Sequence, residues 1–224
     1  MSNLIENNDV NTLGFLSALI ATMMTCIFAL SLFASFWVQT DMVSFVACFI
    51  LAPFFVIMIV CLHYSTPIEK KVWSNIGIVF AVIYAVCILM TYYIQLAVVM
   101  NNPRSFSTDI LEPFIYSNVG SVMFSIDMLG YAFMALSTLL TAAVFAKKSK
   151  LENWIKRFFI LHGLLFIPTL LFPLLPLPQE VITPSGSDNF GSIVLIIWCC
   201  IFAPLAGLVG VYFKQKKNTN ELNH

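Results

Sequence analysis

The stretch MVSFVACFILAPFFVIMIVCL, residues 42–62, decides the fold class, because its 21 consecutive positions contain no charged side chain. An α-helix rises 1.5 Å per residue, so a run of this length spans the roughly 30 Å hydrocarbon core of a bilayer. Five further long apolar runs lie around it, at residues 14–38, 72–100, 118–146, 158–176 and 191–213. The sequence therefore predicts an all-α fold, a polytopic membrane protein built as a bundle of six transmembrane helices.

The composition of the chain supports the same interpretation. Of the 224 residues, 60% are hydrophobic and 10% are charged, which is more apolar surface than a soluble domain of this size can bury. The first 13 residues carry Glu6 and Asp9 but no Lys or Arg, unlike a secretory signal peptide. We therefore expect a single transmembrane domain over residues 1–224, with a retained first helix and no soluble module.

Lys and Arg are divided unequally between the two sides of the predicted membrane. Arg104 alone falls on one side, and the other ten fall in alternate connections and in the C-terminal tail. The ten are Lys70, Lys71, Lys147, Lys148, Lys150, Lys156, Arg157, Lys214, Lys216 and Lys217. Because basic loops stay in the cytoplasm, this asymmetry predicts cytoplasmic N- and C-termini, as an even number of spans requires. The expected location is the cytoplasmic (plasma) membrane, which is the inner membrane in a cell that also has an outer membrane.

Several classes of protein are excluded by missing residues and motifs. No Lys lies inside a predicted span, which excludes a retinal Schiff base, and no span has the repeated Arg of a voltage sensor. Walker, Rossmann, HExxH and G-x-S-x-G motifs are absent, and no basic fold supports nucleic-acid binding. The sequence thus predicts no catalytic residue, no metal site and no cofactor, and an enzyme is the less favoured class.

Asp127 is the only residue of a charged type inside a predicted span, about 13 Å deep at 1.5 Å per residue. A charged Asp at a helix centre costs about 2.5–3.5 kcal/mol, so it must find a partner, reach water or keep its proton. Tyr131 lies one turn away, and Tyr92 and Gln95 lie at similar depth on the third span. We predict that Asp127, Tyr131, Gln95 and Tyr92 form a ligand-binding pocket that opens outward.

The alternative is that these polar side chains only join the helices. Interhelical hydrogen bonds in a membrane average about 0.6 kcal/mol in one well-studied case, so Asp127 and Gln95 would then add modestly to packing. All six cysteines lie within spans, where packing is the default role. Small residues such as Gly207 and Gly210 favour close helix contact, either within the bundle or between copies in a homo-oligomer.

Two histidines are the other polar residues at span ends. His63 ends the second span, and His162 lies about one turn inside the cytoplasmic end of the fifth. Without a further ligand, two histidines give little support to a haem or zinc site. A catalytic pair of His162 and Asp127 is disfavoured, because their depths differ by roughly 10–20 Å on helix-rise arithmetic. Residues 150–158 alternate basic and apolar side chains at helical spacing, which predicts a short interfacial lead-in to the fifth span.

Two short motifs carry a resemblance. The residues Tyr93-Ile94-Gln95-Leu96 in the third span and Ile126-Asp127-Met128-Leu129-Gly130-Tyr131 in the fourth resemble small six-span bacterial integral membrane proteins of unknown function. Such sequences place an acid before Leu-Gly-Tyr and often have a second acid where this chain has Met128. The resemblance implies a six-span plan and no reaction, and the departure at Met128 argues against a paired-carboxylate site.

These observations favour one function and leave two open. The first is the binding or transport of a small molecule, lipid or ion at an outer pocket near Asp127. The second is an embedded enzyme that acts on a lipid, which would need another titratable group at that depth. The third is an assembly or regulatory subunit without a site. The expected partners are membrane lipids, a small-molecule or lipid ligand and further copies of the chain, and no nucleic acid.

Overall fold

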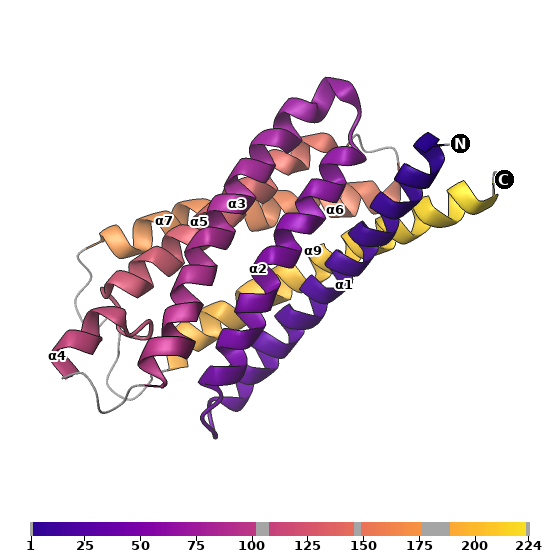
Figure 1. Cartoon of the computed structure of the whole chain (residues 1–224). Helices are drawn as coiled ribbons and strands as arrows, with labels where there is room; N and C mark the ends of the chain where they lie inside the picture. Colours follow the sequence, from indigo (N-terminus) through magenta and orange to yellow (C-terminus); the bar gives the residue numbers. More distant parts are fainter. Residues whose placement is uncertain (1, 102–107, 146–148, 176–188, 223–224) are drawn as a thin grey trace.

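The computed structural model describes residues 2–101, 108–145, 149–175 and 189–222, and all their regular structure is helical (Figure 1). Six helical segments are long and apolar enough to cross a membrane: Asn8–Ala34, Asp41–Tyr64, Ile68–Val99, Val122–Val144, Lys150–Leu174 and Ile193–Asn220. The predicted all-α bundle of six transmembrane helices is therefore confirmed, and the fold is that of a multi-pass membrane protein.

Long helices make up most of each span, and short helical pieces extend them. The long ones are α1 (Ser2–Ala34), α2 (Asp41–Tyr64), α3 (Lys71–Ile94), α5 (Val122–Thr141), α6 (Lys150–Gly163) and α9 (Asn189–Leu222). The short pieces are η1 (Ile68–Lys70), the π-helical η2 (Gln95–Val99), α4 (Thr108–Leu111), η3 (Glu112–Phe114), η4 (Ala142–Val144), α7 (Phe166–Leu171) and η5 (Phe172–Leu174).

The contacts between the helices form a closed cycle. Each long helix packs on the next in the order α1, α2, α3, α5, α6, α9, and α9 returns to α1 (Figure 1). Large side chains fill the space they enclose, and the largest fully buried ones include Phe55, Tyr84, Tyr92 and Phe202. This arrangement brings α2, α3 and α5, which carry the polar residues of interest, into one interior.

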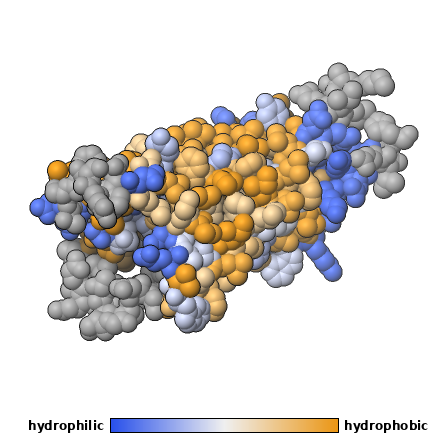
Figure 2. Space-filling model, turned by 60° about the horizontal axis from the view of Figure 1, so that its bottom comes forward, coloured by the Kyte–Doolittle hydropathy of each residue, from blue (hydrophilic) through white to orange (hydrophobic). Residues whose placement is uncertain are grey.

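The outer surface has an apolar middle and polar ends (Figure 2). Large apolar side chains such as Val79, Val86 and Ile197 are exposed on the sides of the bundle, where a soluble protein would be polar. Both ends of the chain lie at the same end of the bundle (Figure 1), and the Asn220 side chain donates a hydrogen bond to Asn8 Oδ1 at 3.4 Å. An even number of crossings accounts for that arrangement.

The fifth span differs in detail from the sequence prediction. Residues 150–158, expected as a short interfacial lead-in to this span, are the first turns of α6 itself. The helix is capped by Ser149, whose hydroxyl accepts from Glu152 N at 3.1 Å. The α-helix stops at Gly163 and restarts as α7. Pro168 explains the break, because a proline ring clashes with the carbonyl four residues earlier, here that of Leu164.

Helices α3 and α5 approach each other closely at Gly77. The Ser137 hydroxyl donates to the Gly77 carbonyl oxygen at 2.7 Å, and a Cβ added at Gly77 would overlap the hydroxyl oxygen of Thr141. Further along the same interface, Gly130 lies against Cys87 and Ile88. These contacts fix the register of the two antiparallel helices.

The small residues of α9 are used inside the bundle. A Cβ at Gly210 would lie 3.5 Å from the Cβ of Ala18 on α1, and one at Gly207 would lie 3.9 Å from the Thr22 hydroxyl. The pattern that suggested either an internal contact or a homo-oligomer therefore serves the α1–α9 contact. Self-association of the chain stays a prediction, and these small residues no longer support it.

Candidate functional site

Asp127 owes its position to the turn that starts α5. Ser121 N donates to the Asn118 carbonyl oxygen at 2.9 Å, and Gly120 within this turn has φ +91°, a conformation that glycine adopts without strain. The Ser121 hydroxyl then caps the helix by accepting from Phe124 N at 3.0 Å. Asp127 follows in the second turn, with only 3% of its side chain exposed.

The carboxyl group of Asp127 is only partly satisfied. The Tyr92 side chain on α3 interacts with it. The carboxyl oxygen Oδ1 is buried and has no hydrogen-bond partner among the described residues. Unpaired buried polar atoms are rare because each costs about 1–3 kcal/mol, so one on a carboxyl group calls for an explanation.

Two more buried oxygens in the described part of the chain have no partner, the hydroxyls of Tyr84 and Thr91. Both belong to α3. Ile88 of α3 contacts Gly130 of α5. Thr91 lies about one turn after Ile88, and Asp127 lies about one turn before Gly130 on the antiparallel helix, so Thr91 and Asp127 are level with each other. Tyr84 is deeper in the bundle, where its ring lies 5.9 Å from that of Tyr131. The α3–α5 interface thus holds all three unpaired oxygens.

Helix α2 closes the cluster with Cys48. The Cys48 sulfur lies 3.5 Å from the Tyr131 hydroxyl, within hydrogen-bonding distance for sulfur, and also interacts with the Tyr92 side chain. The structure therefore brings together three of the four predicted site residues, namely Asp127, Tyr92 and Tyr131, and adds Cys48, which the sequence argument assigned to packing. Depth was the missed signal, because Cys48 lies about 10 Å along α2 from the N-terminal end of this helix at Asp41.

Gln95, the fourth predicted residue, has a different role. Its Nε2 donates to the Phe114 carbonyl oxygen at 2.7 Å, and its Oε1 accepts from Tyr116 N at 3.1 Å. The ring of Tyr116 in turn lies 5.9 Å from Tyr92. Burial of this ring raises the pKa of Tyr116, so its hydroxyl keeps its proton. Gln95 therefore fixes the 114–116 segment against the cluster.

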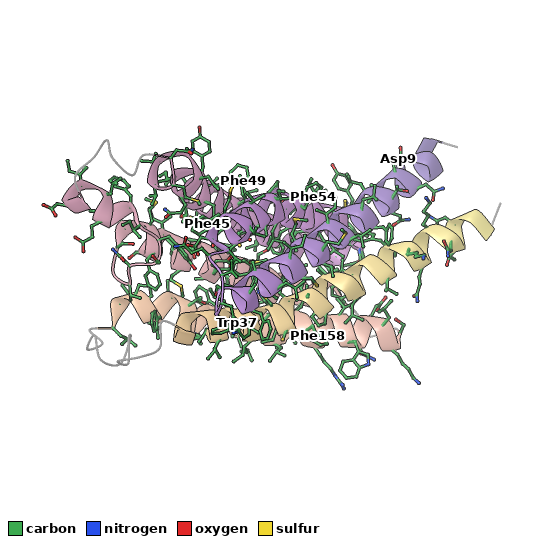
Figure 3. The ribbon with its side chains drawn as sticks, turned by 90° about the horizontal axis from the view of Figure 1, so that it is seen from below. Asp9, Trp37, Phe45, Phe49, Phe54 and Phe158 are labelled. Atoms are coloured by element: carbon green, nitrogen blue, oxygen red, sulfur yellow. The ribbon has the colours of Figure 1, made fainter. Side chains whose placement is uncertain are left out.

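The cluster lies toward the end of the bundle away from the chain termini. Phe45, whose ring centre is 5.6 Å from that of Tyr92, lies on the opposite side of the molecule from Asp9 (Figure 3). The prediction of an opening to that side stays untested. A cavity of about 660 Å³ lies instead at the termini end, between Asn11, Tyr64, Glu152 and Lys216.

His162 belongs to a second buried hydrogen-bond network, which touches the cluster where the Trp198 ring lies 5.2 Å from that of Tyr131. Trp198 Nε1 donates to His162 Nε2 at 3.0 Å, so the ring proton is on Nδ1, which lies 2.8 Å from the Thr138 hydroxyl. The Thr138 hydroxyl itself donates a hydrogen bond to the Ala135 carbonyl oxygen at 2.8 Å. With both nitrogens used in this way, His162 is neutral and joins α5, α6 and α9.

Neither histidine joins Asp127 or forms a metal centre in the described residues. Thr138, the α5 partner of His162, is eleven residues after Asp127, which is about 16 Å along the helix. His63 Nδ1 lies 2.8 Å from the Ser74 hydroxyl. Within residues 2–101, 108–145, 149–175 and 189–222, no group of three or more His, Cys, Asp or Glu side chains could hold a metal ion.

Comparison of the chain with protein-family models, with curated proteins and with solved structures gave no match.

Proposed function

We propose that this multi-pass protein binds or transports a small molecule, lipid or ion at a site centred on Asp127, in a plasma membrane with both chain termini in the cytoplasm. The observation that carries the proposal is Oδ1 of Asp127, a buried carboxyl oxygen without a hydrogen-bond partner among the described residues. Acidic residues inside transmembrane bundles commonly mark substrate and ion pathways, because placing an ionisable group in the membrane costs free energy and such residues are retained mainly where they serve a function.

The neighbours of Asp127 suit a binding site better than a catalytic one. Tyr92, Tyr131 and Cys48 supply hydroxyl and thiol groups, which can donate to a ligand or accept from it. An enzyme that acts on lipids would need a general base beside Asp127, and His162 is about 16 Å away along the bundle. An assembly subunit would need no unpaired acid at all.

Native mass spectrometry of the gently purified protein tests this proposal. We expect a bound species in the wild type that is lost in Asp127→Asn, which changes one carboxyl oxygen to an amide and keeps the shape. Asp109→Asn is the matched control, because Asp109 is exposed and the same chemical change there should leave the bound species in place. Identical spectra from three folded proteins would contradict a small-molecule or lipid site at Asp127 and favour an assembly role.

The orientation is tested separately. Lys70, Lys156 and Lys216 all lie near the end that carries the termini, and positive residues stay in the cytoplasm. A reporter enzyme that is active only outside the cytoplasm should be inactive when fused after residue 224 and active when fused after residue 118. The reverse pattern would show that the termini face outward.

A further inference from the structure

We infer that the negative charge of Asp127 is balanced by a monovalent cation that binds from solution, either sodium or the proton. The inference rests on the proposed function and names the ligand class that couples to this site. It is argued from the charges, the free oxygen atoms and the stoichiometry of the cluster.

The first step concerns charge. A carboxylate inside a helix bundle is stabilised by a cationic side chain or a bound cation, and otherwise it keeps its proton. None of the described Lys or Arg residues is buried, and they lie at the helix ends near the chain termini. Asp127 interacts with the hydroxyl of Tyr92, which is neutral. The described residues therefore leave its charge to be balanced by a cation that enters from solution.

The second step concerns ligands. Small hard cations bind oxygen atoms, and carboxylate oxygens and hydroxyls are suitable donors. Asp127 Oδ1 and the Thr91 hydroxyl are both buried, both unpaired and level with each other on facing helices. In the described part of the chain, these are two of the three buried side-chain oxygens left without a partner, and they belong to the two packed helices α3 and α5.

The third step concerns valence. One carboxylate balances one positive charge, and the described residues offer no second carboxylate at this site. A divalent ion would leave a net positive charge in the bundle interior, which is costly for the same reason as the bare carboxylate. Sodium or a proton leaves the site neutral. The single negative charge of the site therefore favours a monovalent cation over calcium, magnesium or zinc.

Infrared spectroscopy tests the inference on the full-length protein in lipid. A protonated carboxylic acid has a carbonyl stretching band that a carboxylate lacks, so the state of Asp127 is read directly. The wild type, Asp127→Asn and the exposed control Asp109→Asn are compared in sodium chloride and in choline chloride, from acidic to alkaline pH. Thr91→Val is the second variant, because it removes the hydroxyl and keeps the side-chain shape.

Each result decides the inference. A band in the wild type and the control, absent in Asp127→Asn and removed by sodium, supports sodium. Thr91→Val should then need roughly three- to tenfold more sodium, which corresponds to one lost ligand contact. A band that responds to pH and ignores sodium supports the proton.

A band that neither pH nor sodium changes would overturn the inference, as would the absence of any band that Asp127→Asn removes. Such a result leaves the proposed function standing if native mass spectrometry still shows a species that Asp127→Asn loses. The two failures are therefore distinguishable.

Discussion

Replacing Gly77 by Ala perturbs the closest approach of α3 and α5, the two helices that hold Tyr92, Thr91 and Asp127. The added Cβ would overlap the Thr141 hydroxyl oxygen and press on the Ser137 carbonyl oxygen, which would lie 3.3 Å away. The adjacent hydrogen bond from the Ser137 hydroxyl to the Gly77 carbonyl oxygen would be weakened as the backbones shift. Thr141 cannot easily give way, because its hydroxyl also donates to the Ser137 carbonyl oxygen at 2.7 Å. We therefore expect the two helices to separate slightly and the protein to lose stability.

The magnitude follows from three terms. Overpacking a close contact costs about 1–3 kcal/mol, and a weakened interhelical hydrogen bond in a membrane adds about 0.6 kcal/mol. Ala in place of Gly in a helix returns up to about 1 kcal/mol. The sum is a destabilisation of roughly 1–2.5 kcal/mol for Gly77→Ala. Gly207→Ala is the control, because its Cβ meets nothing closer than 3.9 Å and only the favourable helix term applies.

The assay is thermal unfolding of both variants in the same detergent. For a chain of this size, 1 kcal/mol moves the Tm by about 2–4 °C. Gly77→Ala should lower the Tm by roughly 2–10 °C, whereas Gly207→Ala should leave it unchanged or raise it slightly. Equal shifts of the same sign in the two variants would refute the α3–α5 register on which the Asp127 site depends.

Two further substitutions test the buried hydrogen bonds. Gln95→Leu leaves two backbone groups of the 114–116 segment without a partner. Because a lost partner costs about 1–3 kcal/mol, amide hydrogen exchange in this segment should become roughly tenfold faster or more. Unchanged exchange would show that the two Gln95 hydrogen bonds do not hold the segment in place. Trp198→Phe keeps a ring but leaves His162 Nε2 without a donor, and should cost about 1–3 kcal/mol in thermal unfolding. Trp37→Phe, at a 72% exposed residue, should change stability by less than about 0.5 kcal/mol, so comparable losses in both would count against the His162 network.

The fold could be predicted because bilayer crossing depends on properties that the sequence displays directly. Long runs without charge, such as residues 42–62, predict a span from length and composition alone. The break in the fifth span was harder to place, since Pro168 indicates a kink but does not show at which residue the helix stops. The structure puts that stop after Gly163, one turn before the proline.

The site could be predicted only as far as depth along each helix allows. Asp127, Tyr92 and Tyr131 meet because they share a depth and because α3 and α5 are neighbours. Gln95 has the same depth, yet the 114–116 segment folds back and takes both ends of its amide. Such pairings depend on how each helix is rotated about its axis and on how the loops fold back onto the helices. A single sequence shows neither. Cys48 has a suitable depth on α2, but the sequence does not show that its side of α2 faces α5, so depth alone did not assign it to the site.

Asp127 and His162 give opposite solutions to the same problem, a titratable side chain in an apolar bundle. His162 is 0% exposed, and its two nitrogens pair with the Trp198 N–H and the Thr138 hydroxyl, so it stays neutral and complete without any outside group. Asp127 is equally enclosed, yet one of its oxygens is unpaired and an unpaired hydroxyl lies level with it on the facing helix. A bundle that can satisfy a buried histidine in full has the means to satisfy an acid in the same way. The unpaired oxygen of Asp127 is therefore better explained by a partner that enters from solution than by imperfect packing.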